Sequence, residues 1–301
     1  IDPISGVRIV RTCQDAFRHP TATPNQDRSP CATRIVNKSK EPTWLLGVDY
    51  KVSPDLMLYA KYSRGYRQGG INAGNFGIET WEPEKLDSYE VGAKASFRGA
   101  VSGYFNLAGF YNDLSNMQVF AGLTPKPEFT GLGGGAAVIN AASSRSYGLE
   151  AEAFVLLFDS LGLNLGYTYL DTKIKDVLTK AQLLPRLDGT PWGDINPRVQ
   201  PGSAFLDSPK HKFTATATYT LPLDESLGKL SVGATFVHTS KTVNDGAVPR
   251  IVNGINLGLT PTSNLLNLNL DWKNVAGSPF DLAFYATNVT DKNYTIANTG
   301  G

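Results

Sequence analysis

The sequence predicts an all-β protein, specifically part of a transmembrane antiparallel β-barrel. Apolar and polar residues alternate with a period of two in segment after segment, as in residues 212–221, where one face carries Phe213, Ala215, Ala217, Tyr219 and Leu221. A strand with this pattern has one apolar and one polar face. The connections between such segments are alternately short and long, which is typical of the tight periplasmic turns and large extracellular loops of outer-membrane barrels.

The first two hairpins are predicted in residues 44–66 and 88–120. Residues 44–52 alternate, turn at Ser53, Pro54 and Asp55, and resume the same pattern through residues 56–66. Residues 88–98 alternate in the same way, and a turn at 99–103 leads into residues 104–120, where the alternation is less regular. Residues 4–11 are a candidate for one more strand before these hairpins.

Three further hairpins are predicted: residues 137–158 with 161–174, 212–221 with 229–240, and 264–273 with 280–287. The long connections are residues 12–43, 67–86, 121–136, 175–209 and 241–262. Because long and short connections alternate throughout, we expect all turns at one end of the sheet and all large loops at the other. An interfacial girdle is predicted from aromatic residues near strand ends: Trp44, Tyr62, Tyr66, Tyr89, Tyr167, Tyr169, Tyr219 and Trp272.

Composition restricts the function. The chain has 28 basic and 27 acidic residues without a basic cluster, which gives no footprint for nucleic acid. No segment approaches the roughly 18 to 20 consecutive apolar residues that a transmembrane helix needs. Since a bilayer also accepts closed barrels, whose strands need only about 9 to 11 alternating residues, the sequence favours the barrel.

Catalytic and metal-binding patterns are not found, so we expect no enzyme, no cofactor and no metal site. His19, His211 and His238 are far apart in sequence and lack ligand spacing. Glu150 and Glu152 lie two residues apart on one strand face, which resembles a glycosidase pair but is ordinary inside a barrel. The glycine-rich residues 131–135 predict a loop, because no strand-to-helix transition follows them.

Four motifs resemble the TonB-dependent outer-membrane receptors. Residues 59–70 (YAKYSRGYRQGG) resemble the strand end of that family, and residues 81–94 (WEPEKLDSYEVGAK) are similar to the segment that follows it. Residues 147–150 (YGLE) resemble a strand start, and residues 288–294 (NVTDKNY) the segment before the last strand. In order and with proper spacing, these motifs cover most of residues 43–294.

The resemblance implies a 22-stranded barrel with an N-terminal plug that imports a scarce ligand across the bacterial outer membrane. It also implies an energy-coupling TonB complex as partner. Residues 1–301 then form the C-terminal part of the barrel domain, with ten or eleven strands and with the plug and last strand absent. Siderophores, cobalamin and carbohydrates are ligands of such receptors. A passive porin-like channel is the main alternative, and a surface adhesin, an outer-membrane enzyme and a soluble β-sandwich are others.

Ligand capture is expected in the long loops. Aromatic and arginine side chains among Gly, Asn and Pro offer stacking surfaces and fork-shaped donors. The candidates are Arg67, Gln68, Trp81, Trp192 and Arg198. Residues 190–196 are expected to lie in a loop outside the hydrogen-bonded ladder.

Cys13 and Cys31, the two cysteines of the chain, lie in the first long polar connection, and we predict that they form a disulfide in an oxidising compartment. Closure would stabilise the loop by roughly 3 kcal/mol in the chain-entropy model. Thiol labelling of the unreduced, denatured protein should modify neither cysteine. Labelling of both would contradict the pairing.

Overall fold

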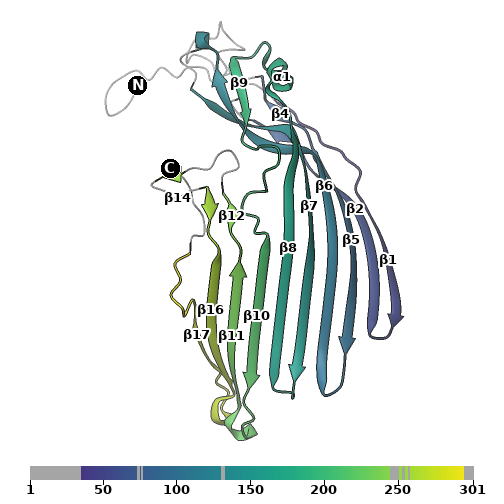
Figure 1. Cartoon of the computed structure of the whole chain (residues 1–301), viewed down its shortest axis with the longest axis vertical. Helices are drawn as coiled ribbons and strands as arrows, with labels where there is room; N and C mark the ends of the chain where they lie inside the picture. The colour runs from purple at the N-terminus through teal and green to yellow at the C-terminus, as the bar shows by residue number, and fades with distance from the viewer. Residues whose placement is uncertain are drawn as a thin grey trace.

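The computed structural model describes residues 35–72, 75, 77–129, 133–244, 251–252, 255–256 and 258–294. They form one large antiparallel sheet that curves like a section of a barrel wall and does not close (Figure 1). The candidate strand at residues 4–11 and both cysteines, Cys13 and Cys31, lie outside the described residues.

All ten predicted strands are confirmed, and each pairs with the next in a simple up-and-down order. They are β1 (Trp44–Ser53), β2 (Leu56–Arg67), β5 (Glu84–Phe97), β6 (Val101–Pro125), β7 (Gly135–Leu157), β8 (Leu161–Val177), β10 (His211–Thr220), β11 (Lys229–Thr239), β16 (Ser263–Lys273) and β17 (Leu282–Ala286). Figure 1 shows the short turns at the lower end and the long connections at the upper end. The turns and the loops therefore lie at opposite ends of the sheet as predicted, but the connection predicted at residues 121–136 is mostly strand, because β6 ends at Pro125 and β7 begins at Gly135.

Smaller elements occupy the long connections. They are β3 (Gly70–Ile71), β4 (Thr80–Trp81), η2 (Pro127–Phe129), α1 (Lys180–Leu183), η3 (Leu184–Leu187), β9 (Trp192–Pro197), β12 (Thr242–Val243), β13 (Ile251–Val252), β14 (Ile255–Asn256) and β15 (Leu259–Thr260). Two short turns carry η4 (Glu225–Leu227) and η5 (Val275–Gly277). None of the helices in the described part of the chain is long and apolar enough to cross a membrane.

The turn between β7 and β8 shows how local sequence sets the hairpin. The N–H of Ser160 donates to the carbonyl of Leu157 at 3.1 Å, and Phe158 and Asp159 between them have φ of 52° and 55°. Two positive φ values make a type I′ turn, whose twist matches that of the flanking strands. Asp tolerates this conformation better than most residues, which explains why a turn forms here without glycine.

The register keeps the apolar and polar faces continuous from strand to strand. Ala217 lies opposite Leu163 on β8 and Ala234 on β11, whereas Thr216 lies opposite Asn164 and Thr235. The hydroxyls of Thr216 and Thr235 are 3.0 Å apart and hydrogen-bonded. In a barrel the apolar face meets lipid and the polar face lines the lumen. A single layer with this pattern is not the two-layer packing of a soluble β-sandwich.

The two edge strands are left open. Every residue of β1 and of β17 is exposed, although both carry apolar side chains such as Val48 and Phe284. An unpaired strand edge is unfavourable in water and more so in lipid, where no solvent satisfies the backbone. The described sheet is therefore a partial barrel whose edges need further strands as partners.

We predict that Ala217→Arg lowers the stability of the assembled barrel by about 2–4 kcal/mol if Ala217 lies near the membrane midplane, because the charge would face lipid. Thr216→Arg places the same side chain on the lumen face and should assemble normally. The measurement is the folded fraction of the full-length protein after refolding into liposomes, determined from its heat-modifiable mobility in gels. Equal tolerance of the two substitutions would contradict the assignment of the faces.

Candidate functional site

The lumen face carries a polar network on β2 and β5. The ammonium of Lys61 lies 2.8 Å from the carboxylate of Glu90, and the hydroxyl of Tyr59 donates to the same carboxylate at 2.9 Å. The Tyr59 ring covers Gly92, where a Cβ would lie 2.5 Å from the ring, and Lys94 lies 5.7 Å from its centroid. These contacts satisfy charged groups on the inner wall and leave a hydrophilic surface toward the lumen.

Beyond the membrane-spanning length, β6 and β7 continue as an extracellular hairpin. They contain 25 and 23 residues, whereas about 9–11 residues span a bilayer. The β8–β10 connection supplies β9, which pairs with β6 between Ala121 and Pro125. We call this hairpin, together with β9, α1, η3 and the β2–β5 connection, the loop assembly.

The loop assembly has a hydrophobic core of its own, which the sequence did not predict. This core contains Val119, Ala121, Leu123, Ala137, Ile139, Ala141, Ala142, Ile174, Leu183, Leu187, Trp192 and Ile195. Burial of each larger side chain in this core stabilises the folded loops by about 1.5–3 kcal/mol. The extracellular connections therefore pack into one body. A packed assembly presents its surface residues in fixed positions, as a binding site requires.

Asparagine side chains attach the β2–β5 connection to the edge of β7. Asn72 donates from Nδ2 to the carbonyl of Val138 at 2.9 Å and accepts the Val138 N–H at 2.8 Å. Asn140 makes the equivalent pair with Glu82, donating to its carbonyl at 2.9 Å and accepting its N–H at 2.7 Å. Each side-chain amide thus makes the pair of hydrogen bonds that the backbone of a neighbouring strand would otherwise make.

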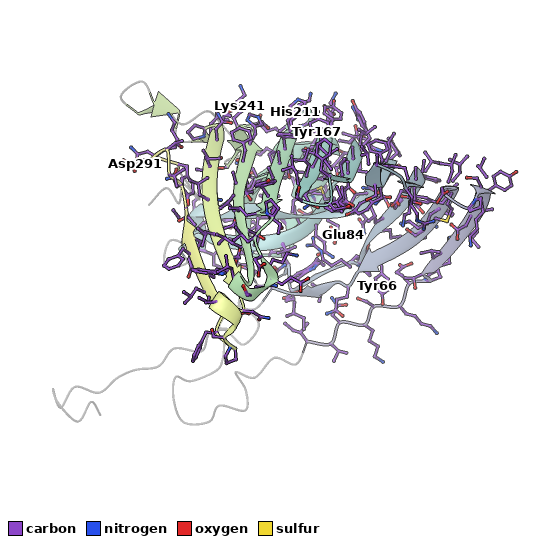
Figure 2. The ribbon with its side chains drawn as sticks, turned by 90° about the horizontal axis from the view of Figure 1, so that it is seen from below. Tyr66, Glu84, Tyr167, His211, Lys241 and Asp291 are labelled. Atoms are coloured by element: carbon purple, nitrogen blue, oxygen red, sulfur yellow. The ribbon has the colours of Figure 1, made fainter. Side chains whose placement is uncertain are left out.

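Three of the five predicted ligand residues come together at the base of this connection. The guanidinium of Arg67 pairs with the buried Glu84 through two contacts of 2.9 and 3.0 Å. Gln118 donates to the carbonyl of Gln68 at 3.0 Å, and the ring of Trp81 packs directly over Gly70. In the register of β2 and β5, Arg67 lies opposite Glu84 and the neighbouring Tyr66 lies opposite Lys85; Figure 2 labels Tyr66 and Glu84 on these two strands.

The other two predicted residues belong to the β9 region. Trp192 is only 2% exposed and packs in the core of the loop assembly. Arg198 is exposed, and its backbone N–H donates to the carbonyl of Phe120 at 2.8 Å. Phe120 is 65% exposed, so this part of the assembly presents a ring and a guanidinium to solvent.

The expectation that residues 190–196 lie outside the ladder is wrong. Gly122, Leu123 and Thr124 pair with Asn196, Ile195 and Asp194, and Trp192 pairs with Pro125. The segment looks like a loop in sequence because its pairing partner is about 70 residues away. The buried Trp192 and Ile195 are three residues apart, because the register shifts between Thr124 and Pro125, so the segment lacks the period of two that marks a strand.

A polar hollow of about 640 Å³ lies at the root of the loop assembly. Its polar lining comes from Asn116, Asn140, Ser143, Asp176, Thr179, Gln182 and Arg186. Arg186 donates to the carbonyl of Asn140 at 3.2 Å. The sequence did not single out these residues, because three separate segments bring them together. Among the described residues, no group of three or more His, Cys, Asp or Glu side chains is arranged to hold a metal ion.

We predict that Trp192→Ala destabilises the loop assembly by about 3–5 kcal/mol, the usual cost of removing a buried Trp. Limited proteolysis of the full-length protein in detergent should then cleave within residues 175–210, while the barrel keeps its heat-modifiable mobility. Asn196→Ala is the matched control, because Asn196 is exposed on the same strand. Resistance of the Trp192→Ala protein equal to that of the control would show that Trp192 does not hold the assembly.

Comparison with known proteins identifies the family. Residues 6–289 match the family model described as TonB dependent receptor-like, beta-barrel. A curated relative, the probable TonB-dependent siderophore receptor PiuA of Acinetobacter baumannii, is 23% identical over 274 residues, which are 86% of this chain and 33% of PiuA. This chain therefore spans about a third of the length of that relative.

Solved structures share the fold. The ferric yersiniabactin uptake receptor FyuA of Yersinia pestis aligns with a TM-score of 0.63 at 16% identity, over 85% of this chain and 33% of FyuA. The crystal structure of PiuA aligns with a TM-score of 0.62 at 20% identity, over 86% of this chain and 33% of PiuA. The strand order, the two-faced sheet and the family match agree, and the chain belongs to the TonB-dependent receptor β-barrel family of the bacterial outer membrane.

Proposed function

We propose that this chain is the strand-rich wall and part of the ligand-capturing surface of an energy-coupled importer of a ferric siderophore. The family match supports a transport receptor rather than an enzyme. The relative PiuA is described as a siderophore receptor, and FyuA as a ferric yersiniabactin uptake receptor, which favours an iron chelate over cobalamin or a carbohydrate.

The observation that carries the proposal is the packed loop assembly above the strand ends. Three long connections share one hydrophobic core and hold Arg198, Phe120 and the polar hollow in fixed positions. A ferric siderophore complex is often anionic and carries aromatic or hydroxyl groups. Guanidinium forks and ring faces suit such a ligand. Arg67, Gln68 and Trp81 are proposed to support this surface from below, and Trp192 to hold it together.

The lumen face supports the idea of a plug and a TonB partner. Its network of Lys61, Glu90, Tyr59 and Lys94 is hydrophilic and partly exposed, as expected of a wall that contacts a second folded segment or water. A passive porin-like channel would also have a polar wall. The two functions differ in their energy requirement, which an uptake experiment measures.

Uptake of a ⁵⁵Fe-loaded siderophore by cells that carry the full-length receptor tests both parts of the proposal. A protonophore should abolish uptake but leave surface binding unchanged, since capture precedes energy-coupled transport. Arg198→Gln should weaken surface binding by about tenfold, a loss typical of one charged contact. The control is Arg98→Gln, which removes an exposed guanidinium at the opposite, turn end of β5.

Two results would count against the proposal. Uptake that continues after the proton-motive force has collapsed would identify a passive channel. Equal binding by Arg198→Gln, Arg98→Gln and the unmodified receptor would remove Arg198 from the ligand site.

A further inference from the structure

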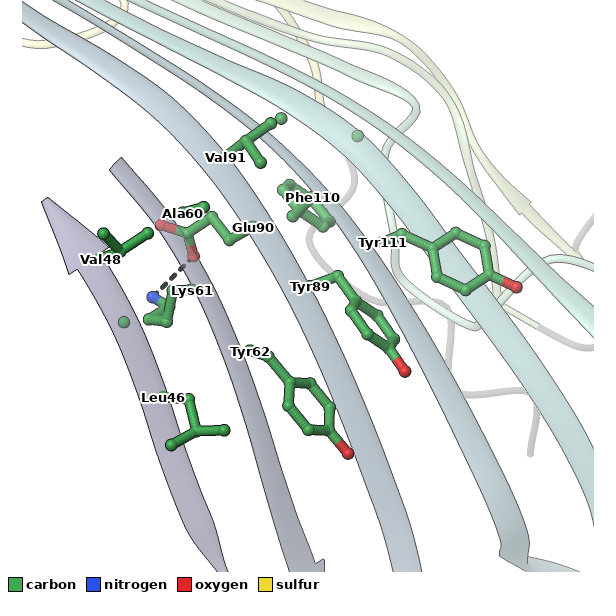
Figure 3. Close-up of a pocket in the computed structure, with 13 residues that line it drawn as sticks. Leu46, Val48, Ala60, Lys61, Tyr62, Tyr89, Glu90, Val91, Phe110 and Tyr111 are labelled. Carbon is green, nitrogen blue, oxygen red and sulfur yellow. Dashed lines mark ion pairs between the residues drawn. The ribbon is translucent and has the colours of Figure 1, made fainter. Parts of the chain in front are cut away.

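A hollow of about 700 Å³ lies along β1, β2, β5 and β6, where lipid-facing residues of these strands alternate with the lumen-facing Lys61, Glu90 and Phe110 (Figure 3). Leu46, Val48, Ala60 and Val91 supply its apolar lining. Its floor lies at Gly109, where an added Cβ would meet nothing closer than the carbonyl of Gly148 at 3.9 Å. The missing side chain at Gly109 therefore leaves space that the neighbouring strands do not fill.

A row of tyrosines borders the hollow on its extracellular side. Tyr62, Tyr89, Tyr111 and Tyr147 are successive partners in the register of β2, β5, β6 and β7. The rings of Tyr62 and Tyr89 stack with their centroids 4.9 Å apart. Such a row on the lipid face marks the level where acyl chains give way to head groups.

A cluster with excess positive charge lies just beyond this row. Asp171, the partner of Tyr147 in the β7–β8 ladder, lies 3.7 Å from Arg145 and 3.1 Å from Lys210. Lys173 is exposed and lies opposite Arg145. Asp113 lies opposite Arg145 on β6 and pairs with Lys175 at 2.7 Å. Four basic side chains and two carboxylates therefore lie in this region, and we call Arg145, Lys173 and Lys210 the basic cluster.

Aromatic rings hold two of these bases at the interface. The guanidinium of Arg145 lies 4.8 Å from the centroid of Tyr147, and the ammonium of Lys210 lies 5.6 Å from that of Tyr169. The ring of Tyr169 in turn contacts His211, which is hydrogen-bonded to Tyr167 at 2.9 Å, and Figure 2 shows these two side chains together. Cation–π contacts keep the bases at the head-group level and leave donors for an anion.

We propose that this face binds one phosphorylated lipid of the outer leaflet, with an acyl chain in the hollow over Gly109 and a phosphate on the basic cluster. Tyr111 lines the hollow and pairs with Tyr147, and Arg145 is two residues farther along β7, a distance of about 7 Å along the strand. A single lipid spans that distance. Basic side chains near a membrane surface attract anionic head groups by about 1 kcal/mol each. The inference does not depend on which ligand the receptor imports.

The test measures lipid A bound to the full-length receptor in phosphatidylcholine nanodiscs by native mass spectrometry, with diphosphoryl lipid A and a phosphate-free analogue as probes. Arg145→Gln combined with Lys210→Gln should weaken retention of the diphosphoryl probe by about fivefold for each charge removed. Retention of the phosphate-free analogue should not change. Arg98→Gln, at the other end of the sheet, is the control for loss of charge.

Filling the hollow tests the acyl site separately. Gly109→Leu should weaken retention of both probes. The control is Gly166→Leu, because Gly166 lies on the lumen face and a Cβ there meets nothing within 4 Å. Equal retention by the Arg145/Lys210 variant and the Arg98 control, or equal loss of the two probes from the charge variant, would overturn the proposal. If Gly109→Leu fails to assemble, the charge variant still decides the outcome.

Discussion

Hydrogen bonding of the backbone within the membrane is the constraint on which this structure depends. In the large sheet, the eight strands between β1 and β17 in the order β1-β2-β5-β6-β7-β8-β10-β11-β16-β17 pair on both sides, so their N–H and C=O groups need no water. At the two ends of this order β1 and β17 lack a partner on one side as described, and β9, in the loop assembly, pairs with β6 alone. The ladder fixes the register, and with it the face of every side chain, because a shift of one residue would turn lipid-facing Ala217 inward and Thr216 outward.

The same register separates two kinds of chemistry. On the lumen face, Lys61, Glu90 and Tyr59 form a polar network that a hydrated wall tolerates. On the lipid face, the charged residues lie past the tyrosine row, where Arg145 and Lys210 rest against Tyr147 and Tyr169. Outside the membrane the sheet is no longer limited by lipid, and the extended β6–β7 hairpin becomes the base of a packed assembly that resembles a small soluble domain.

The sequence was sufficient for the parts that period-two alternation determines. Strands such as β1 and β10 begin and end within one or two residues of the prediction. A strand with one apolar and one polar face shows this alternation in its own sequence, without reference to its neighbours. The loop assembly was not predictable in this way. Trp192 and Ile195 pack against core members on β6 and β7 that lie 50 or more residues away, and Asn72 and Asn140 bind backbone groups that only the tertiary fold brings near. Arg67 and Trp81 were recognised as distinctive residues, but their contacts with Glu84 and Gly70 depend on the pairing of β2 with β5 and on the hairpin of β3 and β4.

The assignment of the two faces is the central claim, and spin-label accessibility along β10 tests it most directly. Single nitroxide labels at each position from 212 to 219 of the full-length receptor in liposomes would be relaxed by oxygen, which concentrates in lipid, or by a water-soluble nickel chelate. If alternate residues of β10 face lipid, oxygen accessibility has a period of two, high at Phe213, Ala215, Ala217 and Tyr219 and low at Lys212, Thr214, Thr216 and Thr218. Accessibility without a two-residue period, or with the opposite phase, would contradict the assignment of the faces.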